Sequence, residues 1–240
     1  MEVRIFNSAD EIAVACADII CELISAKPAC VLGLATGASP VKTYNELIRR
    51  YKNNEISFKE IKTFNLDEYC NLPREDKNSY YTFMHENLFN SVDICEENVH
   101  ILDGNAENAD EEAKAFDEAI DNAGGIDIQL LGIGTNGHIG FNEPSDTFSD
   151  GTFKVKLTDS TIKSNSIYFE NDSMPRFALT MGINSIMKAK KIVLIATGAS
   201  KAEAIKATIN GEVTPQCPAS VLQKHPDAVL LIDKDAASLL

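Results

Sequence analysis

Short apolar segments alternate with amphipathic segments along almost the whole chain. The apolar segments have the length of short β-strands, and the others carry apolar residues at the spacing of a helix. The expected strands cover residues 2–6, 31–34, 61–66, 126–131, 192–196 and 228–232. This alternation predicts an α/β fold with a doubly wound, mostly parallel, Rossmann-like sheet flanked by helices on both faces. Since no linker or change of composition divides the chain, we expect residues 1–240 to form a single domain.

Several of the expected helices have recognisable start signals. Ser8 and Glu11 fit a capping box, in which each residue satisfies a backbone N–H at the helix start. Ser39 is a good N-cap residue, and Pro40 is a good first helical residue. Weaker patterns predict helices over 107–122 and 201–210, a strand over 153–157 and a short helix after residue 232.

Composition and charge exclude several classes of protein. The 240 residues carry a formal net charge of −14 with no basic stripe, which argues against a nucleic-acid partner. No signal-peptide pattern or apolar run of membrane-spanning length is present, so we expect no membrane association. The six cysteines form no C-x-x-C motif, which predicts a reduced, cytoplasmic protein without disulfides or a zinc site. They lie at positions 16, 21, 30, 70, 95 and 217.

The most chemically distinctive stretch runs from 130 to 144, where an apolar strand ends in a series of glycines. Polar groups after a strand end are how open α/β sheets build their sites, so Asn136, His138 and Glu143 are candidates for catalysis. The glycines also fit G-x-G-x-x-G, which marks a dinucleotide site only when a helix follows directly. Because Pro144 would stop such a helix, we expect no nicotinamide cofactor. A hydrogen-bonded turn histidine is the plainer alternative for His138.

A second candidate feature is a strand–turn–helix corner that occurs twice. Residues Thr36, Gly37, Ala38 and Ser39 follow an apolar strand and precede a helix, and the same four residue types recur at 197–200. Free backbone N–H groups and the positive end of a helix dipole suit such a corner to a phosphate. Lys201, at the start of the second helix, opposes that dipole unless an anion lies nearby. The two corners and this lysine predict a phosphate pocket, although each could be an ordinary turn beside an exposed lysine.

Asp67 ends another expected strand and completes a set of acid–base groups. A carboxylate can remove a proton from a carbon beside a carbonyl, and an imidazole can move a proton on a ring oxygen. The sequence has no His/Cys/Asp cluster at metal spacing and no serine in a nucleophile elbow. General acid–base chemistry by Asp67, His138 and Glu143 therefore fits best, with no metal. A solvated acidic turn is the alternative for Asp67.

Four stretches of the chain resemble the glucosamine-6-phosphate deaminase family, and the resemblance extends over nearly the whole chain. They are L-G-L-A-T-G at 32–37, F-N-L-D-E-Y at 64–69, G-T-N-G-H-I-G-F-N-E-P at 134–144 and A-L-T-M-G-I at 178–183. The resemblance implies conversion of glucosamine 6-phosphate and water to fructose 6-phosphate and ammonia, in amino-sugar catabolism and without a cofactor. It assigns ring opening to His138, with Glu143 and Asn136 orienting it, and proton transfer between C2 and C1 to Asp67. It assigns the phosphate to residues 36–39 and Lys201.

Two positions depart from the pattern of the resembled family. Many members have Asp where this chain has Asn136, and the family usually has a phosphate-binding arginine where this chain has Ile167. Losing that charge-assisted contact should weaken phosphate binding by about 1.5–3 kcal/mol, unless Lys163 or Arg176 substitutes for it. The polar segment at about 158–178 is expected to form a mobile lid.

Three other functions remain open alternatives. A deaminase of galactosamine 6-phosphate would need the same groups, and a 6-phosphogluconolactonase-like hydrolase shares the fold. The third is a non-catalytic sugar-phosphate-binding sensor, although such regulators carry a DNA-binding module that this chain lacks. Some relatives are allosteric hexamers with a longer C-terminal tail. Since this chain stops at Leu240, we expect a monomer or small homo-oligomer.

Overall fold

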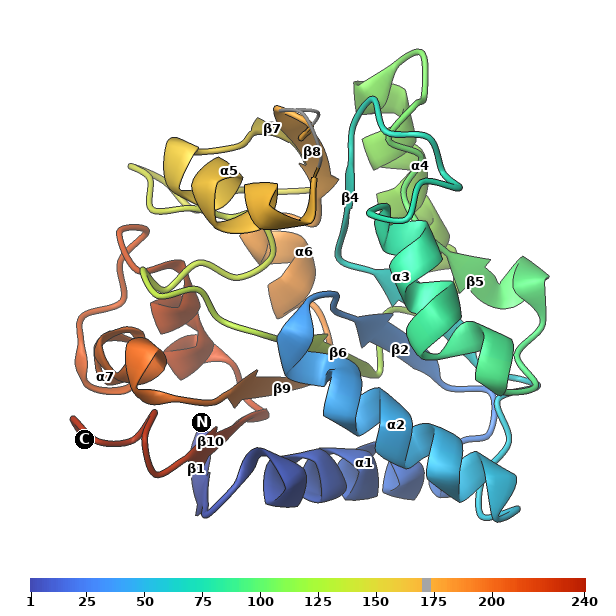
Figure 1. The fold of residues 1–240 in the computed structure, drawn as a ribbon, viewed down its shortest axis with the longest axis horizontal. Helices are drawn as coiled ribbons and strands as arrows, with labels where there is room; N and C mark the ends of the chain where they lie inside the picture. The colour runs from blue at the N-terminus through green and yellow to red at the C-terminus, as the bar shows by residue number, and fades with distance from the viewer. Residues whose placement is uncertain (170–173) are drawn as a thin grey trace.

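The computed structural model describes residues 1–169 and 174–240 and contains a central parallel sheet (Figure 1). The strand order is β1-β10-β9-β6-β2-β3-β5, and every neighbouring pair is parallel. The predicted α/β class is therefore confirmed. The strands are β1 (Glu2–Phe6), β2 (Val31–Leu34), β3 (Lys62–Asn65), β5 (Val99–His100), β6 (Ile128–Leu131), β9 (Lys191–Ala196) and β10 (Ala228–Asp233).

The chain reverses direction across this sheet between β2 and β6. From β2 it proceeds outward to β3 and β5, and from β6 it proceeds the opposite way to β9 and β10. Loops leaving the carboxyl ends of two such strands diverge, which opens a crevice between them. The carboxyl ends of β2 and β6 are therefore where the topology favours a binding site.

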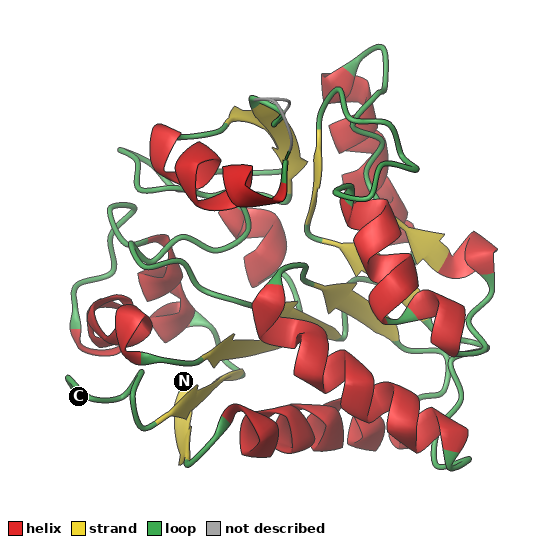
Figure 2. Cartoon of the chain, in the orientation of Figure 1, coloured by secondary structure: helices red, strands yellow, loops and turns green. Residues whose placement is uncertain are grey.

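Helices cover both faces of the sheet, as predicted (Figure 2). Apolar side chains of α1 (Ala9–Ala26), α2 (Ala38–Lys52) and α3 (Tyr80–Asn87) pack with one set of strand residues. Those of α4 (Ala109–Asn122), α6 (Ile183–Met187) and α7 (Ala202–Asn210) pack with the other set. The strands thus bury both faces, which explains why they read as continuous apolar runs.

A small antiparallel sheet, which the sequence pattern did not predict as a unit, lies beyond the carboxyl ends of the central strands (Figure 1). It contains β4 (Asp67–Tyr69), β8 (Phe177–Thr180) and β7 (Phe153–Lys156), in that order. The chain passes from β3 through Leu66 into β4, so one continuous segment joins the two sheets. α5 (Asp159–Asn165) packs on this sheet through a third apolar cluster that includes Tyr69, Phe141 and Leu157.

Three expected helix features are wrong, and one is confirmed. Ser8 accepts a hydrogen bond from the backbone N–H of Glu11 at 3.2 Å, as expected of the N-cap of α1. Ser39 is not an N-cap and Pro40 is not the first helical residue, because α2 begins two residues earlier, at Ala38, and Gly37, at φ 89°, takes the cap position. The residues after β10 form turns rather than a short helix.

The short 3-10 helices are η1 (Phe89–Ser91), η2 (Glu96–Asn98), η3 (Ser166–Tyr168), η4 (Ala199–Lys201) and η5 (Pro218–Lys224).

The structure also bears on the expectations for the cysteines, for membrane-spanning helices and for the segment 158–178. All six cysteines are free thiols in the structure. Among the described residues, no helix combines the length and apolar character needed to cross a bilayer. The expected lid at 158–178 comprises α5, η3 and the start of β8, while its residues 170–173 lie outside the described part of the chain.

Candidate functional site

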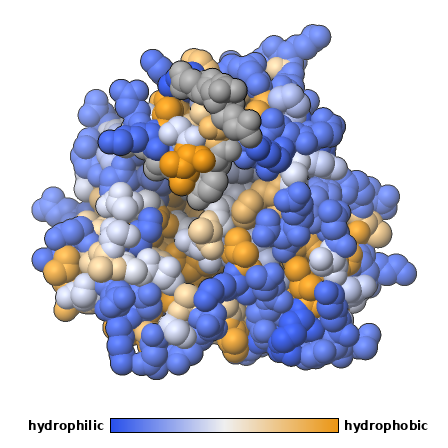
Figure 3. All heavy atoms as spheres, viewed as in Figure 1, coloured by the Kyte–Doolittle hydropathy of each residue, from blue (hydrophilic) through white to orange (hydrophobic). Residues whose placement is uncertain are grey.

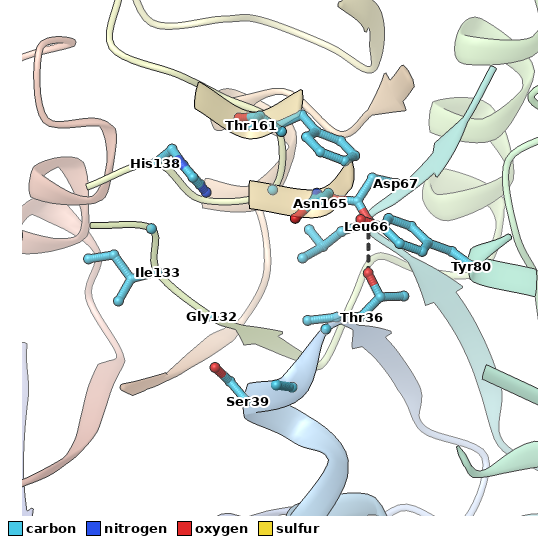
Figure 4. A pocket seen from close by; sticks show the side chains of 16 residues that line it. Thr36, Ser39, Leu66, Asp67, Tyr80, Gly132, Ile133, His138, Thr161 and Asn165 are labelled. Carbon is cyan, nitrogen blue, oxygen red and sulfur yellow. Dashed lines mark hydrogen bonds between the residues drawn. The ribbon is translucent and has the colours of Figure 1, made fainter. Parts of the chain in front are cut away.

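A cavity of about 190 Å³ opens at the carboxyl ends of β2, β3 and β6. Hydrophilic residues cover most of the rim of this face, while apolar and neutral ones gather near its centre (Figure 3). The cavity receives side chains from the central sheet, from α3, from the loop after β6 and from α5 (Figure 4). Its lining comprises Ala35, Thr36, Gly37, Ala38, Ser39, Leu66, Asp67, Tyr80, Gly132, Ile133, Gly134, His138, Gly140, Phe141, Thr161 and Asn165.

The first strand–turn–helix corner forms the floor of this cavity. Gly37 adopts φ 89°, a value that side chains disfavour, and the chain then turns directly into α2. No side chain caps the first turn of α2, so its backbone N–H groups are not satisfied by a protein oxygen at the cap position. Ser39 does not cap the helix, contrary to the prediction from the sequence, but lines the cavity. Residues 36–39 therefore present an uncapped helix start to the cavity, which is the feature that the predicted phosphate site requires.

The second corner has a similar backbone but different surroundings. Gly198 adopts φ 87°, and its N–H donates to both carboxylate oxygens of Asp233 at 3.0 and 2.9 Å. Asp233 also accepts from the N–H of Ala236 at 2.7 Å. A carboxylate of the protein itself therefore occupies the position that an anion would take at Gly198. The two corners still adjoin, because Ser39 and Thr197 line one hollow of about 160 Å³.

Lys201 is not among the residues that line the cavity in this structure. Its side chain is half-buried at the end of η4, and burial lowers the pKa of its ammonium group. It forms no ion pair within the described residues. A half-buried cation without a counter-charge is consistent with an anionic ligand, but the structure by itself does not bring Lys201 into the cavity.

Asp67 lies on the cavity wall, where the chain passes from the large sheet into β4. Only 6% of its surface is exposed. Burial, with a smaller contribution from the neighbouring Glu68 carboxylate, raises the pKa of Asp67 to about 7. The Thr36 hydroxyl donates a long hydrogen bond of 3.4 Å to Asp67 Oδ1, which opposes this rise. A carboxyl group with a pKa near neutrality can both accept and return a proton, as a general base must.

His138, Asn136 and Glu143 form a second polar group, on the loop that follows β6. Asn136 Nδ2 donates to Glu143 Oε2 at 2.6 Å, and Asn136 Oδ1 accepts from the backbone N–H of His138 at 3.2 Å. His138 Nδ1 lies 3.4 Å from Glu143 Oε2, within ion-pair distance but without the alignment of a hydrogen bond. In Figure 4 the imidazole ring extends toward the cavity that Asp67 also lines. Asp67 and His138 therefore share one cavity, whereas Asn136 and Glu143 are not among its lining residues and lie behind His138.

Glu143 is fixed from its other side by α5. Thr161 donates to Glu143 Oε1 at 2.6 Å, and the Thr158 hydroxyl lies 3.3 Å from the same oxygen. Hydrogen bonds and the proximity of His138 outweigh burial and lower the pKa of Glu143 to about 2. The carboxylate is therefore ionised at any physiological pH and can balance a positive charge that develops on His138.

Several lining residues were not identified from the sequence. Tyr80 is the first residue of α3, and its ring stacks on Phe141 with centroids 6.1 Å apart. Thr161 and Asn165 reach the cavity from α5. The Ser79 and Thr158 N-cap signals could have located the helices α3 and α5. Nothing in the sequence pattern indicates that the helix starts converge on Asp67.

The geometry of the glycine-rich loop does not resemble a dinucleotide site. Gly137, at φ 85°, closes a tight turn by donating to the carbonyl of Gly134 at 3.1 Å. No helix follows within 132–152, a segment that the structure describes completely. Across the described residues, no three His, Cys, Asp or Glu side chains are grouped so that they could hold a metal ion.

Comparison with known proteins identifies the family. The family model described as glucosamine-6-phosphate isomerases/6-phosphogluconolactonase matches residues 7–231. The chain belongs to this family. Within it, a glucosamine-6-phosphate deaminase of Thermoanaerobacter pseudethanolicus is 51% identical over 241 residues, covering 100% of this chain and 95% of the relative. A glucosamine-6-phosphate deaminase of Lysinibacillus sphaericus is 53% identical over 226 residues, covering 94% and 95%.

Solved structures agree with this assignment to the isomerase/lactonase family. A monomeric glucosamine-6-phosphate deaminase superposes with a TM-score of 0.97 at 43% identity, and each chain is covered completely. A 6-phosphogluconolactonase from Trypanosoma cruzi superposes with a TM-score of 0.80 at 19% identity, which demonstrates a common fold only. The resemblance inferred from the sequence motifs is therefore confirmed.

Proposed function

We propose that the protein is a glucosamine-6-phosphate deaminase, which converts glucosamine 6-phosphate and water to fructose 6-phosphate and ammonia. The observation that carries this proposal is one cavity lined by Asp67, by His138 and by the corner at 36–39. Relatives with this name at about 50% identity over essentially the full chain support it. A role in amino-sugar catabolism follows from the same chemistry.

The phosphate binds, in this proposal, at the corner formed by Thr36, Gly37, Ala38 and Ser39. Uncapped N–H groups at the start of α2 and the positive end of its dipole favour a dianion there. Lys201 supplies the positive charge that a backbone cradle lacks. Its half-buried ammonium group would gain a counter-ion on binding, which would offset the cost of its burial.

His138 opens the pyranose ring. Ring opening moves a proton from the C1 hydroxyl to the ring oxygen, and a neutral imidazole can perform both transfers. Asn136 orients the backbone of His138, and ionised Glu143 stabilises the imidazolium form that arises during the transfer. The product of this step is the open-chain amino aldehyde.

Asp67 then isomerises the open chain. Its carboxylate removes the proton from C2 while the substrate's own ammonium group passes a proton to the aldehyde oxygen, so an enolamine of the enediol type forms. The protonated Asp67 then returns its proton to C1. The imine left at C2 adds water and releases ammonia, so atoms balance and no oxidant or reductant is needed. A pKa of about 7 makes Asp67 basic enough to accept the proton and acidic enough to return it near neutral pH.

An ammonia-release assay with glucosamine 6-phosphate tests the proposal, with fructose 6-phosphate measured in parallel. Asp67→Asn is the control, because it preserves the shape of the site and removes the base. Ammonia released equally by this variant would exclude the mechanism. Parallel assays with galactosamine 6-phosphate and 6-phosphogluconolactone test the alternative enzymes, and binding without turnover would indicate a sensor.

Three further properties form part of the proposal. The segment 158–178 acts as a lid, since Thr161 and Asn165 reach from α5 into the cavity. A cytoplasmic location agrees with six free thiols. A monomer or small homo-oligomer agrees with the superposed deaminase, which is monomeric, and light scattering after gel filtration measures the oligomeric state directly.

A further inference from the structure

Glu68 is a buried carboxylate with no part in the mechanism described above. It follows Asp67 in β4, and successive side chains of a strand point to opposite sides, so Glu68 extends away from the cavity. Only 5% of its surface is exposed. A buried carboxylate needs hydrogen-bond donors, and within the part of the chain that the structure describes those of Glu68 are backbone N–H groups.

The donors of Glu68 are at the start of α3. Glu68 Oε1 accepts from the N–H groups of Tyr80 at 2.9 Å and Tyr69 at 2.7 Å, and Oε2 accepts from that of Tyr81 at 2.8 Å. The N-cap residue Ser79 satisfies the next N–H of the helix, that of Thr82, at 3.0 Å. The first turn of α3 is thus attached to β4 by one carboxylate.

We propose that Glu68 is a positioning residue for the reaction: it anchors α3 to β4, holds Asp67 and Tyr80 together on the cavity wall and places a negative charge beside Asp67. Tyr80 is the first residue of α3, lines the cavity and stacks on Phe141 from the loop that carries His138. The anchor therefore links the base and the aromatic wall. This inference rests on the proposed function for its catalytic meaning.

The charge of Glu68 adds an electrostatic effect to this mechanical one. Burial raises the pKa of Glu68, but its three N–H donors and the guanidinium of Arg74 oppose the rise and favour the carboxylate. The carboxylate in turn disfavours ionisation of Asp67. The other titratable groups around Asp67 are Tyr80 of α3, Tyr69 of β4 and His138 across the cavity. Unlike these three groups, Glu68 contributes to the raised pKa of Asp67.

The test is the pH profile of kcat/KM for Glu68→Gln. Removing the negative charge of Glu68 should lower the pKa of Asp67, so the fall of kcat/KM on the acid side of the profile should move down by about 1 pH unit. Asp67 would then be a weaker base, which should lower kcat about tenfold. Glu68→Asp keeps the charge and should leave the limb in place. Ser79→Ala is the matched control, since it removes a cap from the same helix turn without changing any charge.

A purely structural role predicts a different result. Glu68→Gln and Ser79→Ala would then lower the melting temperature and kcat but leave the acid limb unmoved, which would overturn the proposal. Should Glu68→Gln not fold, Arg74→Met tests the same link: losing the cation that favours the Glu68 carboxylate should also move the limb downward, and an unmoved limb would overturn the proposal equally.

A second measurement separates this inference from the proposed function. The carboxyl band of Asp67, isolated by infrared difference between the protein and its Asp67→Asn variant, gives the pKa of Asp67 without any substrate. We expect the pKa of Asp67 to fall in Glu68→Gln and to be unchanged in Ser79→Ala, even if no deaminase activity is found. An unchanged Asp67 pKa in Glu68→Gln would refute the role assigned to Glu68.

Discussion

Replacing Gly134 by Ala should impair catalysis by moving His138, without disturbing the fold. The ring of His138 lies directly over Gly134, in a turn closed by the bond from the N–H of Gly134 to the carbonyl of His138 at 2.9 Å. A methyl group on Gly134 would lie 2.2 Å from His138 Cε1, 2.3 Å from Nδ1 and 2.5 Å from Nε2. Gly134 is not among the residues with positive φ, so alanine fits its backbone.

The size of the effect follows from these distances. An ordinary contact begins at 3.4 Å, so the imidazole must retreat by about 1 Å. A displacement of that size at a reacting group can cost about 100-fold in rate, or about 2.7 kcal/mol in activation free energy. We therefore expect kcat for ammonia release to fall about 100-fold in Gly134→Ala, with a melting temperature close to that of the unmodified protein.

Gly132→Ala is the matched control for this prediction. It adds the same methyl group two residues earlier in the same loop, but that group would meet Ser39 Cβ and Oγ at 3.9 Å, an ordinary contact. Because Gly132 also lines the cavity, the control can raise KM, but it leaves the position of His138 unchanged. Equal kcat values for Gly134→Ala and the unmodified protein would show that the imidazole takes no part in the reaction.

Three further variants test other parts of the site. Asp67 has its pKa raised from 3.8 to about 7 on folding, so the native state binds the extra proton and loses stability as pH rises between these values. Asp67→Asn should therefore be inactive, yet more stable to thermal unfolding above pH 7 by up to about 4 kcal/mol, with no advantage below pH 4. Lys201→Met should raise KM for the sugar phosphate at least tenfold while Lys206→Met, at an exposed position, does not. Ile167 is 76% exposed and outside the cavity lining. Ile167→Arg should therefore lower KM for the sugar phosphate only if the segment 158–178 closes over the phosphate. An unchanged KM would mean that position 167 does not reach the phosphate.

Local signals in the sequence predicted many elements and most of the candidate groups. The strand from Val31 to Leu34 was located to the residue, because a strand buried on both faces is a continuous apolar run bounded by turn residues. The cap at Ser8 was correct for a similar reason, since a capping box involves only neighbours in the chain. Asp67 and His138 were found because each follows such a strand.

Interactions between distant segments account for the errors and omissions. Ser39 has the residue type of an N-cap, but Gly37 with its positive φ starts α2 earlier, and the side chain of Ser39 joins the cavity lining. The antiparallel sheet was missed because β4 has only three residues and pairs with β8, more than 100 residues away. The partner of Gly198, the carboxylate of Asp233, is likewise invisible in the repeated corner motif.

The sequence by itself determined the α/β order, the residues that end the strands and the chemical types available for a reaction, because these depend on periodicity and on local turn chemistry. Only the tertiary structure decided which groups act together. The near-neutral pKa of Asp67 arises from burial and from Glu68, and Glu68 is held by the first turn of α3. Likewise, Thr161 of α5 fixes Glu143, which lies 18 positions earlier in the chain. Desolvation and hydrogen bonding depend on how segments far apart in the chain pack together, and no local pattern encodes them.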